Sequence, residues 1–285
     1  MSWKLLAGGG VFGSTSMLLM KNDWDVSSLG VVRFGRAVHT VFGMVTDYQV
    51  GLHGMVPGTE EYLEKKSKIH LKAALRLRKL CCDNGGVFVK VGQHLGSLDY
   101  LLPKEYIQTM KVLLDRAPQS SLHDLFRTVK EDLGEDASQL FKSFDPEPLG
   151  TASLAQVHKA TLHDGRVVAV KIQHPKVKAH SRVDIETIHF LVSCVAFLFP
   201  EFQYKWLGEE TKKNLPRELN FLHEATNCQR VERLFKHFTF LKVPKIHWDL
   251  TTERVLTMEF CEGGKVDDKK IWKRHISLLM RSLRI

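Results

Sequence analysis

Cysteine is scarce in this chain of 285 residues, and no two of its five cysteines have the Cys-x-x-Cys spacing. An odd set without that spacing argues against a disulfide framework and a structural zinc site, and it indicates a reducing compartment. His223-Glu224 begins like the helix of a zinc protease, but the second histidine is missing, so we expect no metal site. The five cysteines are Cys81, Cys82, Cys194, Cys228 and Cys261.

Zinc-finger spacing and aromatic RNA-binding motifs are also absent, and the 41 lysines and arginines are spread through the chain. We therefore expect no nucleic-acid partner. The formal net charge of +9 favours other acidic partners, namely nucleotides and anionic membrane lipid. An ordinary solvated surface would carry the same charge.

Long hydrophobic runs are missing too. The segment from Leu5 to Met20 consists of apolar and small residues between Lys4 and Lys21, too short for a membrane span but long enough for a signal core. We predict that residues 1–24 form a targeting or membrane-anchor leader. The glycines within this segment match a dinucleotide-binding pattern formally, but no strand precedes them, so they predict no such site.

A β-hairpin is predicted near the middle of the chain. Ala155 to Leu162 and Val167 to Gln173 are rich in β-branched and apolar residues, and Asp164-Gly165 between them favours a reversing turn. Ala169 and Lys171 share one face because side chains alternate along a strand. The run Val-Ala-Val-Lys that ends at Lys171 is typical of the kinase strand whose lysine pairs with ATP phosphates. A surface hairpin whose lysine points to water remains the alternative.

Three further motifs accompany this strand. Lys90-Val91-Gly92-Gln93 lies upstream, Gly150 to Gln156 is a loop with alanines where a kinase loop has glycines, and Glu218 to Glu224 lies downstream. Over roughly residues 25 to 265 the chain resembles the UbiB-like, aarF-domain-containing atypical kinases, which combine a Lys-x-Gly-Gln motif, an alanine-rich loop and a Glu-x-Asp motif.

The resemblance implies a site for ATP or ADP with magnesium. Lys171 matches the phosphate-binding lysine, and Glu224 matches the helix glutamate that holds it. Glu186, in the segment Val183 to Phe199, is a rival for that glutamate, or simply a solvated residue near a helix start. The remaining nucleotide-binding candidates are Ala152, Ser153 and Gln156 in the loop and Met258 behind the adenine.

The resemblance also implies a regulatory contact. Lys90, Gly92 and Gln93 match an extension that folds over the nucleotide site, and Glu218 matches the first acid that pairs with it. The second acid is replaced by Asn220, which keeps hydrogen-bonding capacity but loses a charge. Without the other motifs, Lys90 would be interpreted as a solvated helix lysine.

Catalytic residues are not recognisable. Phosphoryl transfer in this superfamily needs a catalytic-loop aspartate, an asparagine and a later metal-binding aspartate, and no motif of that kind occurs. We therefore expect a truncated, ATP-binding or ADP-binding protein without full phosphoryl-transfer activity. The alternative is a non-catalytic scaffold or regulator of mitochondrial membrane organisation. The resemblance implies a mitochondrial location and a nucleotide or mitochondrial membrane protein as partner, whereas the sequence alone would also allow secretion.

The predicted fold is α+β, with the smaller lobe of an atypical kinase, a helical N-terminal extension and no second lobe. A basic amphipathic helix is expected from Glu61 to Cys82, packed on its own domain or lying on a membrane surface, and the break after it places Lys90 on a new helix. A serine cap precedes a helix at Leu122 to Leu133, and strands are expected at Lys245 to Trp248 and Arg254 to Phe260. The predicted domains are 1–24 (leader), 25–135 (helical extension), 136–265 (kinase-like lobe with inserted helices) and 266–285 (atypical tail).

Overall fold

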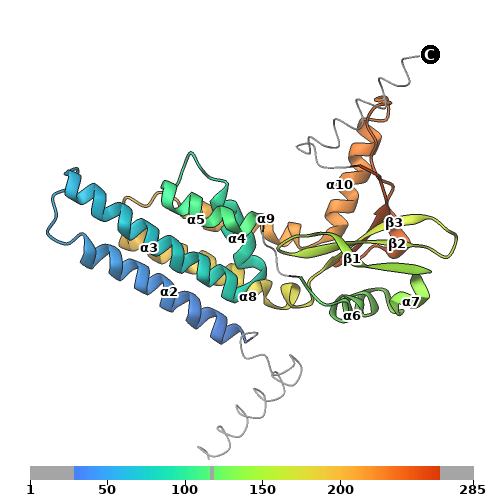
Figure 1. Ribbon diagram of the computed structural model, residues 1–285, viewed down its shortest axis with the longest axis horizontal. Helices are drawn as coiled ribbons and strands as arrows, with labels where there is room; N and C mark the ends of the chain where they lie inside the picture. Colours follow the sequence, from blue (N-terminus) through green and yellow to red (C-terminus); the bar gives the residue numbers. More distant parts are fainter. Residues whose placement is uncertain (1–28, 116–118, 264–285) are drawn as a thin grey trace, which may run out of the picture.

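A computed structural model describes residues 29–115 and 119–263, so the predicted leader and tail lie outside the described residues. Figure 1 shows a body of long helices beside a small sheet. The helical body contains α2 (Gly30–Gly51), α3 (Glu60–Asn84), α4 (Gly86–Gly96), α5 (Lys104–Asp115), α8 (Pro175–Leu198) and α9 (Lys205–Glu218). The sheet region contains α6 (Leu122–Leu133), α7 (Ala137–Leu140), β1 (Ser143–Thr151), β2 (Ala155–Thr161), β3 (Val167–Gln173), α10 (Phe221–Leu234), the 3-10 helix η2 (Trp248–Leu250) and β4 (Val255–Glu259).

The sheet is antiparallel, with the strands in the order β1-β2-β3-β4. The predicted hairpin of β2 and β3 is confirmed, and Val157 lies opposite Lys171 in its register. Gly165 occupies the turn with a φ of 89°, a left-handed conformation that glycine adopts without strain. On the other side of β3, Ala169 lies opposite Met258 of β4.

The two faces of the sheet have different coverings. Val168, Val170 and Ile172 of β3 point into an apolar core with α6 and α7, and all three are fully buried. Each such side chain contributes about 1.5–3 kcal/mol through its burial. The opposite face packs only in part, beneath α10, through a small cluster that includes Phe221 and Leu256. Alternation therefore places Lys171 on the less covered face.

Local capping signals set the helix boundaries. Thr59 accepts a hydrogen bond from the backbone of Tyr62 at the start of α3, and Gly85, with a φ of 65°, separates α3 from α4. The predicted break before the Lys90 helix is thus confirmed. Ser121 caps α6 by accepting from the backbone N–H of Asp124, also as predicted.

The helical body has its own core, contributed by every helix in it. Helices α8 and α9 lie between β3 and β4 in sequence, yet α8 packs against α2 and α4, and α9 packs against α8. Among the described residues, none of the helices combines the length and apolarity needed to cross a membrane. The core side chains include Ala37, Leu80, Val87, Phe88, Met110, Leu113, Ile188, Leu191 and Leu215.

Two predicted elements differ from the structure. Lys245 to Trp248 is not a strand, because only Ile246 forms a bridge there and the chain then turns at His247, whose carbonyl accepts from Leu250. Glu186 is not near a helix start, because α8 begins at Pro175, whose fixed φ suits the first helical position.

The predicted loop Gly150 to Gln156 is also shorter than expected. Gly150 and Thr151 still belong to β1, where they pair with Val157 and Gln156, so only Ala152–Leu154 lie between the strands. Strand β1 was not predicted from the sequence. Its irregular pairing and its exposed residues explain the absence of a clear alternating pattern.

Candidate functional site

Lys171 and Glu224 form a bidentate ion pair on the less covered face of the sheet. The Nζ of Lys171 donates to Oε1 and Oε2 of Glu224 at 2.8 and 2.6 Å. The same ammonium lies 4.7 Å from the ring centroid of Phe221, a cation–π contact. Glu186, the rival, pairs instead with Lys212. The lysine side chain is 24% exposed and that of the glutamate 47%, so the pair remains accessible to a solute.

The start of α10 aims Glu224 at the strand. Asn220 caps the helix, since its Oδ1 accepts from the backbone of Leu222 at 3.0 Å. Phe221 anchors the same turn because its backbone N–H donates to the carbonyl of Glu253, just before β4. Glu224 follows in the first turn, where the helix dipole favours a carboxylate. The residue that departs from the family's acidic motif thus has a structural role as a helix cap.

A second ion pair joins α4 to α9. The Nζ of Lys90 lies 2.9 Å from Oε2 of Glu218, with side chains that are 26% and 38% exposed. His94 lies one turn beyond Lys90 on α4. Burial lowers the pKa of His94, and the positive charge of Lys90 lowers it further, while the carboxylate of Glu218 acts in the opposite direction. The pair therefore belongs to a small coupled group of charges.

Gln93 connects the same helix to the β1–β2 turn. Its Oε1 accepts from the hydroxyl of Ser153 at 3.1 Å, and its Nε2 donates to the carbonyl of Leu113 at 2.8 Å. Gly92 lets α4 approach its neighbours, because a Cβ there would lie 2.5 Å from Leu113 Cδ1 and 3.1 Å from Cys81 Sγ. In the Lys-x-Gly-Gln motif, the lysine thus pairs with Glu218, the glycine permits close helix packing, and the glutamine binds the β1–β2 turn.

The turn itself is held from behind by His174, a residue that was not among the sequence candidates. The backbone N–H of Ala152 donates to the carbonyl of Ala155 at 2.8 Å, which closes the turn. The Nε2–H of His174 donates to the Ala152 carbonyl at 3.0 Å, and its Nδ1 lies 2.8 Å from the hydroxyl of Ser120. Burial lowers the pKa of His174, while the hydrogen bond to the Ala152 carbonyl acts in the opposite direction. No local pattern in the sequence indicates this role.

Two other candidates lie on opposite faces of the sheet. Met258 shares the face of Lys171 and packs in the cluster with Phe221. Gln156 lies on the other face, where it is buried and its Oε1 accepts from the backbone N–H of Ser120. Alternation along β2 explains the difference, because Gln156 is adjacent to Val157, the register partner of Lys171.

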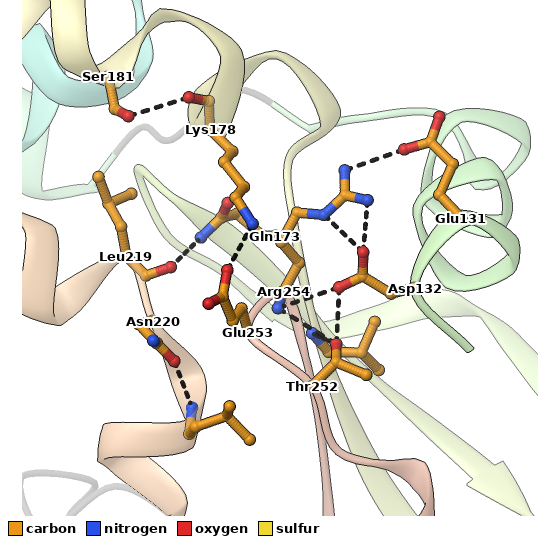
Figure 2. A network of polar contacts seen from close by, with 12 residues as sticks. Glu131, Asp132, Gln173, Lys178, Ser181, Leu219, Asn220, Thr252, Glu253 and Arg254 are labelled. Atoms are coloured by element: carbon orange, nitrogen blue, oxygen red, sulfur yellow. Dashed lines mark hydrogen bonds and ion pairs between the residues drawn. The ribbon is translucent and has the colours of Figure 1, made fainter. Parts of the chain in front are cut away.

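The turn before β4 is clamped to α6 by a polar network that the sequence did not reveal (Figure 2). The Nε of Arg254 donates to Oδ1 of Asp132 at 2.8 Å, and Thr252 donates its hydroxyl to Oδ2 at 2.7 Å. Burial alone would raise the pKa of Asp132, but the hydrogen bonds from Arg254 and Thr252 outweigh it and lower that pKa. Arg254 also pairs with Glu131 at 3.0 Å.

Gln173 extends this clamp to the α9–α10 junction (Figure 2). It is fully buried, two residues beyond Lys171, and its Nε2 donates to the carbonyl of Leu219 at 3.1 Å. Leu219 lies between Glu218 and Asn220. One amide therefore fixes β3 against the segment that supplies both acids of the candidate site.

Neither of two cavities, of about 360 and 280 Å³, is lined by Lys171 or Glu224. The first lies between α2 and α3, and the second lies near the N-termini of α4 and α8. Within residues 29–115 and 119–263, no three His, Cys, Asp or Glu side chains gather in a way that could hold a metal ion.

Comparison with known proteins gives consistent matches. A model of the ABC1 atypical kinase-like domain matches residues 112–280. The chain is 53% identical over 270 residues to AarF domain-containing protein kinase 1 of Mus musculus, covering 95% of this chain and 50% of that protein. It is 48% identical over 274 residues to AarF domain-containing kinase 1 of Drosophila melanogaster, covering 94% and 53% respectively.

A solved structure was matched as well. It is a Mycobacterium tuberculosis protein in complex with erythromycin, 29% identical, with a TM-score of 0.46 over 70% of this chain and 51% of that chain. The chain spans about half the length of the curated relatives it matches.

Proposed function

Because this chain belongs to the ABC1 atypical kinase-like family, we propose that it binds ATP or ADP, with magnesium, on the sheet face that carries Lys171. The observation that carries the proposal is the bidentate pair of Lys171 and Glu224. An ammonium held in place by a carboxylate, yet still accessible, is suited to a phosphate oxygen. The ion pair with Glu224 also argues against the alternative in which Lys171 simply points to water.

The surrounding residues fit a nucleotide. Ala169 is small and lies next to Lys171 on the same face, so it leaves room above the strand. Val157 and Met258, on either side, are partly exposed apolar side chains on which a flat base could rest. In this proposal Lys171 contacts the phosphates and Met258 the base, while Gln93 and Ser153 hold the turn in position.

Magnesium would arrive with the nucleotide and neutralise part of the phosphate charge. The nearby carboxylates of Glu218 and Glu224 are each paired with a lysine in the structure. We therefore propose no side chain among the described residues as a metal ligand. Asn220 is occupied as a helix cap.

Phosphoryl transfer is a separate question. The sequence contains no recognisable catalytic-loop aspartate or later metal-binding aspartate, so we propose that this chain binds nucleotide without phosphoryl transfer. For the longer relatives, kinase or ATPase activity remains a proposal from the family. A mitochondrial location is proposed from the resemblance and from the apolar stretch Leu5 to Met20, and import of a variant lacking residues 1–20 tests it.

A non-catalytic scaffold at a membrane is the second candidate. One specific observation favours it, namely a long helix whose outer face bears no charged side chain. The two functions are compatible because the helix lies in the helical body, away from the ion pair of Lys171. They can be tested independently.

Thermal unfolding with magnesium and either ADP or ATP tests the nucleotide proposal. Ligand at about 100 times its Kd stabilises by about 2.7 kcal/mol, which raises Tm by roughly 4–5 °C in a chain of this size. Lys171→Met should abolish the shift, because it keeps the length of the side chain but removes its charge. Lys130→Met, an exposed lysine on α6, is the matched control and should keep the full shift.

A wild-type chain that shows no shift with either nucleotide would overturn the proposal. An equal loss of the shift in both lysine variants would also contradict it, because the effect would then reflect net charge rather than the site. The Tm of each variant without nucleotide identifies variants that simply fold less well.

A further inference from the structure

Two cysteine thiols lie close to the candidate site. The first is Cys228, one turn beyond Glu224 on α10, so the two side chains are neighbours on the same face of that helix. Cys228 is partly buried, and its thiol donates to the carbonyl of Pro244 at 3.4 Å. Its sulfur therefore points from α10 toward the chain segment that precedes η2.

That segment pairs with the end of β4. The backbone N–H of Glu259 donates to the carbonyl of Lys245 at 2.8 Å, and the N–H of Lys245 donates to the Glu259 carboxylate at 3.2 Å. An ion pair of 2.6 Å between Lys242 and Glu259 adds to this contact. The second thiol belongs to Cys261, which is exposed and follows two residues after Glu259. Because paired strands lie about 5 Å apart, the pairing brings Cys261 close to Pro244 and therefore to the first thiol.

Mutual charge effects support this proximity. The pKa of Cys228 is raised by burial first and then by nearby negative groups, which include Glu224 and Cys261. The pKa of Lys242 is raised mainly by its hydrogen bond with Glu259, and Cys261 contributes in the same direction. Interactions of this kind weaken with distance and with screening by salt. The sulfur of Cys261 is therefore near both the thiol on α10 and the ammonium of Lys242.

The other cysteines in the described part of the chain do not form such a pair. Cys81 and Cys82 are adjacent on α3, where successive side chains point about 100° apart. Cys81 is buried, which raises the pKa of its thiol to about 12, whereas Cys82 is exposed. Cys194 lies on α8, in the helical body. Cys82 thus provides a matched control, since it is an exposed cysteine outside the candidate pair.

We propose that Cys228 and Cys261 form a reversible disulfide when the chain is exposed to hydrogen peroxide. The exposed sulfur of Cys261 attacks one peroxide oxygen and the O–O bond breaks, which gives a sulfenic acid and water. The sulfur of Cys228 then attacks the oxidised sulfur and the S–O bond breaks. The leaving hydroxide takes up the proton of the Cys228 thiol as a second water. Two molecules of glutathione reverse the reaction by thiol–disulfide exchange, so in a reducing compartment the bond is transient and senses oxidant.

The disulfide regulates the candidate site, a step that rests on the proposed nucleotide function. Both carboxylate oxygens of Glu224 engage Lys171 in the structure, so phosphate binding to that lysine requires the ion pair to adjust. The disulfide lies one turn further along α10 and joins this helix to the end of β4, three residues beyond Met258. It restrains both the helix that carries the glutamate and the strand on which the base rests. The oxidised chain therefore binds nucleotide more weakly than the reduced chain.

Mass spectrometry of the purified full chain tests the disulfide. The reduced chain is treated with hydrogen peroxide, its remaining thiols are blocked, and it is digested without reductant. The number of free thiols per chain should fall from five to three, and one peptide should link Cys228 to Cys261 within a single chain. Cys261→Ser should prevent the link, and Cys82→Ser should leave it intact.

Two measurements on the wild-type chain show whether the fold directs the link, and they stay decisive if a variant folds poorly. Because a disulfide restricts the unfolded chain, the oxidised form should have a higher Tm than the reduced form, and dithiothreitol should reverse the rise. In urea that unfolds the chain, the link between Cys228 and Cys261 should lose its preference over links to Cys82. The proposal would be overturned by a link that forms only between chains, by the same preference in folded and unfolded chain, or by a lower Tm on oxidation.

The regulatory step has its own readout. The Tm shift with magnesium and ADP should be smaller for the oxidised chain, and reduction should restore it. An unchanged shift in a chain whose disulfide is verified would refute the regulation. A reduced chain without any shift would instead count against the proposed nucleotide function, while the mass spectrum and the Tm without nucleotide still decide the disulfide.

Discussion

The ion pair of Lys90 and Glu218 offers a sharp test of how the Lys-x-Gly-Gln helix is held. Exposed pairs contribute about 0.2–1 kcal/mol, and loss of one partner from a buried pair costs about 3–5 kcal/mol. With a separation of 2.9 Å and side chains 26% and 38% exposed, this pair falls nearer the exposed class. We expect Lys90→Ala and Glu218→Ala to show a coupling of about 0.5–1 kcal/mol, within the range for contacting residues.

Urea unfolding of the wild type, both single variants and the double variant measures this coupling. Lys90→Ala combined with Glu186→Ala is the control cycle, because Glu186 pairs with Lys212 instead. That cycle should be additive within about 0.3–0.5 kcal/mol. Additivity in the Lys90 and Glu218 cycle as well would show that the two side chains do not interact.

His94 provides a second measurement with a predicted sign. Its pKa lies below the ordinary value because of burial first and then the charge of Lys90, with Glu218 opposing. Lys90→Ala should therefore raise the pKa of His94, and Glu218→Ala should lower it, as followed by NMR titration. Shifts in the same direction in both variants would refute the arrangement of charges, even if the stability cycle showed coupling.

Three other outcomes follow from the contacts. Hydrogen bonds with Arg254 lower the pKa of Asp132 below its ordinary 3.8, so this carboxylate stabilises the fold at neutral pH, and the benefit is lost as pH falls through the folded-state pKa. The difference in unfolding free energy between wild type and Asp132→Asn should therefore shrink in acid. A difference that stays constant with pH would contradict this. Gly96→Ala should destabilise the protein by about 1–3 kcal/mol, since its Cβ would lie 3.1 Å from the backbone of α5. Gly35→Ala, where the Cβ would meet open space, should stabilise it by about 0.5–1 kcal/mol. The opposite order of the two Tm values in thermal unfolding would count against the packing. We expect no magnesium-dependent ATP hydrolysis above background, and hydrolysis that Lys171→Met removes would disprove this expectation.

The sequence alone determined those features that depend on neighbouring residues. The hairpin of β2 and β3 was predicted because the strand residues and the Asp-Gly turn act over a few positions. The end of α3 at Gly85 and the Ser121 cap of α6 follow equally local rules. The errors arose where local signals were weak, as at Lys245 to Trp248, where pairing with β4 is limited to a single bridge at Ile246 before the chain turns.

The candidate site was anticipated only through its family resemblance. Lys171 and Glu224 are separated by 53 residues, and no local propensity brings them together. The resemblance named the partners, but it did not provide the bidentate geometry or the capping role of Asn220. It also grouped Gln156 with the nucleotide loop, although strand alternation places that side chain on the opposite face.

Tertiary packing alone decided the remaining features. Arg254 and Asp132 are 122 residues apart, and their pairing depends on how α6 lies against the turn before β4. The direction in which the charged side chains of α2 point likewise could not be foreseen, because their partners lie on α3 and α8. Only the positions of α3 and α8 determine that these charges point inward, since an ion pair between helices depends on their docking rather than on the composition of either helix.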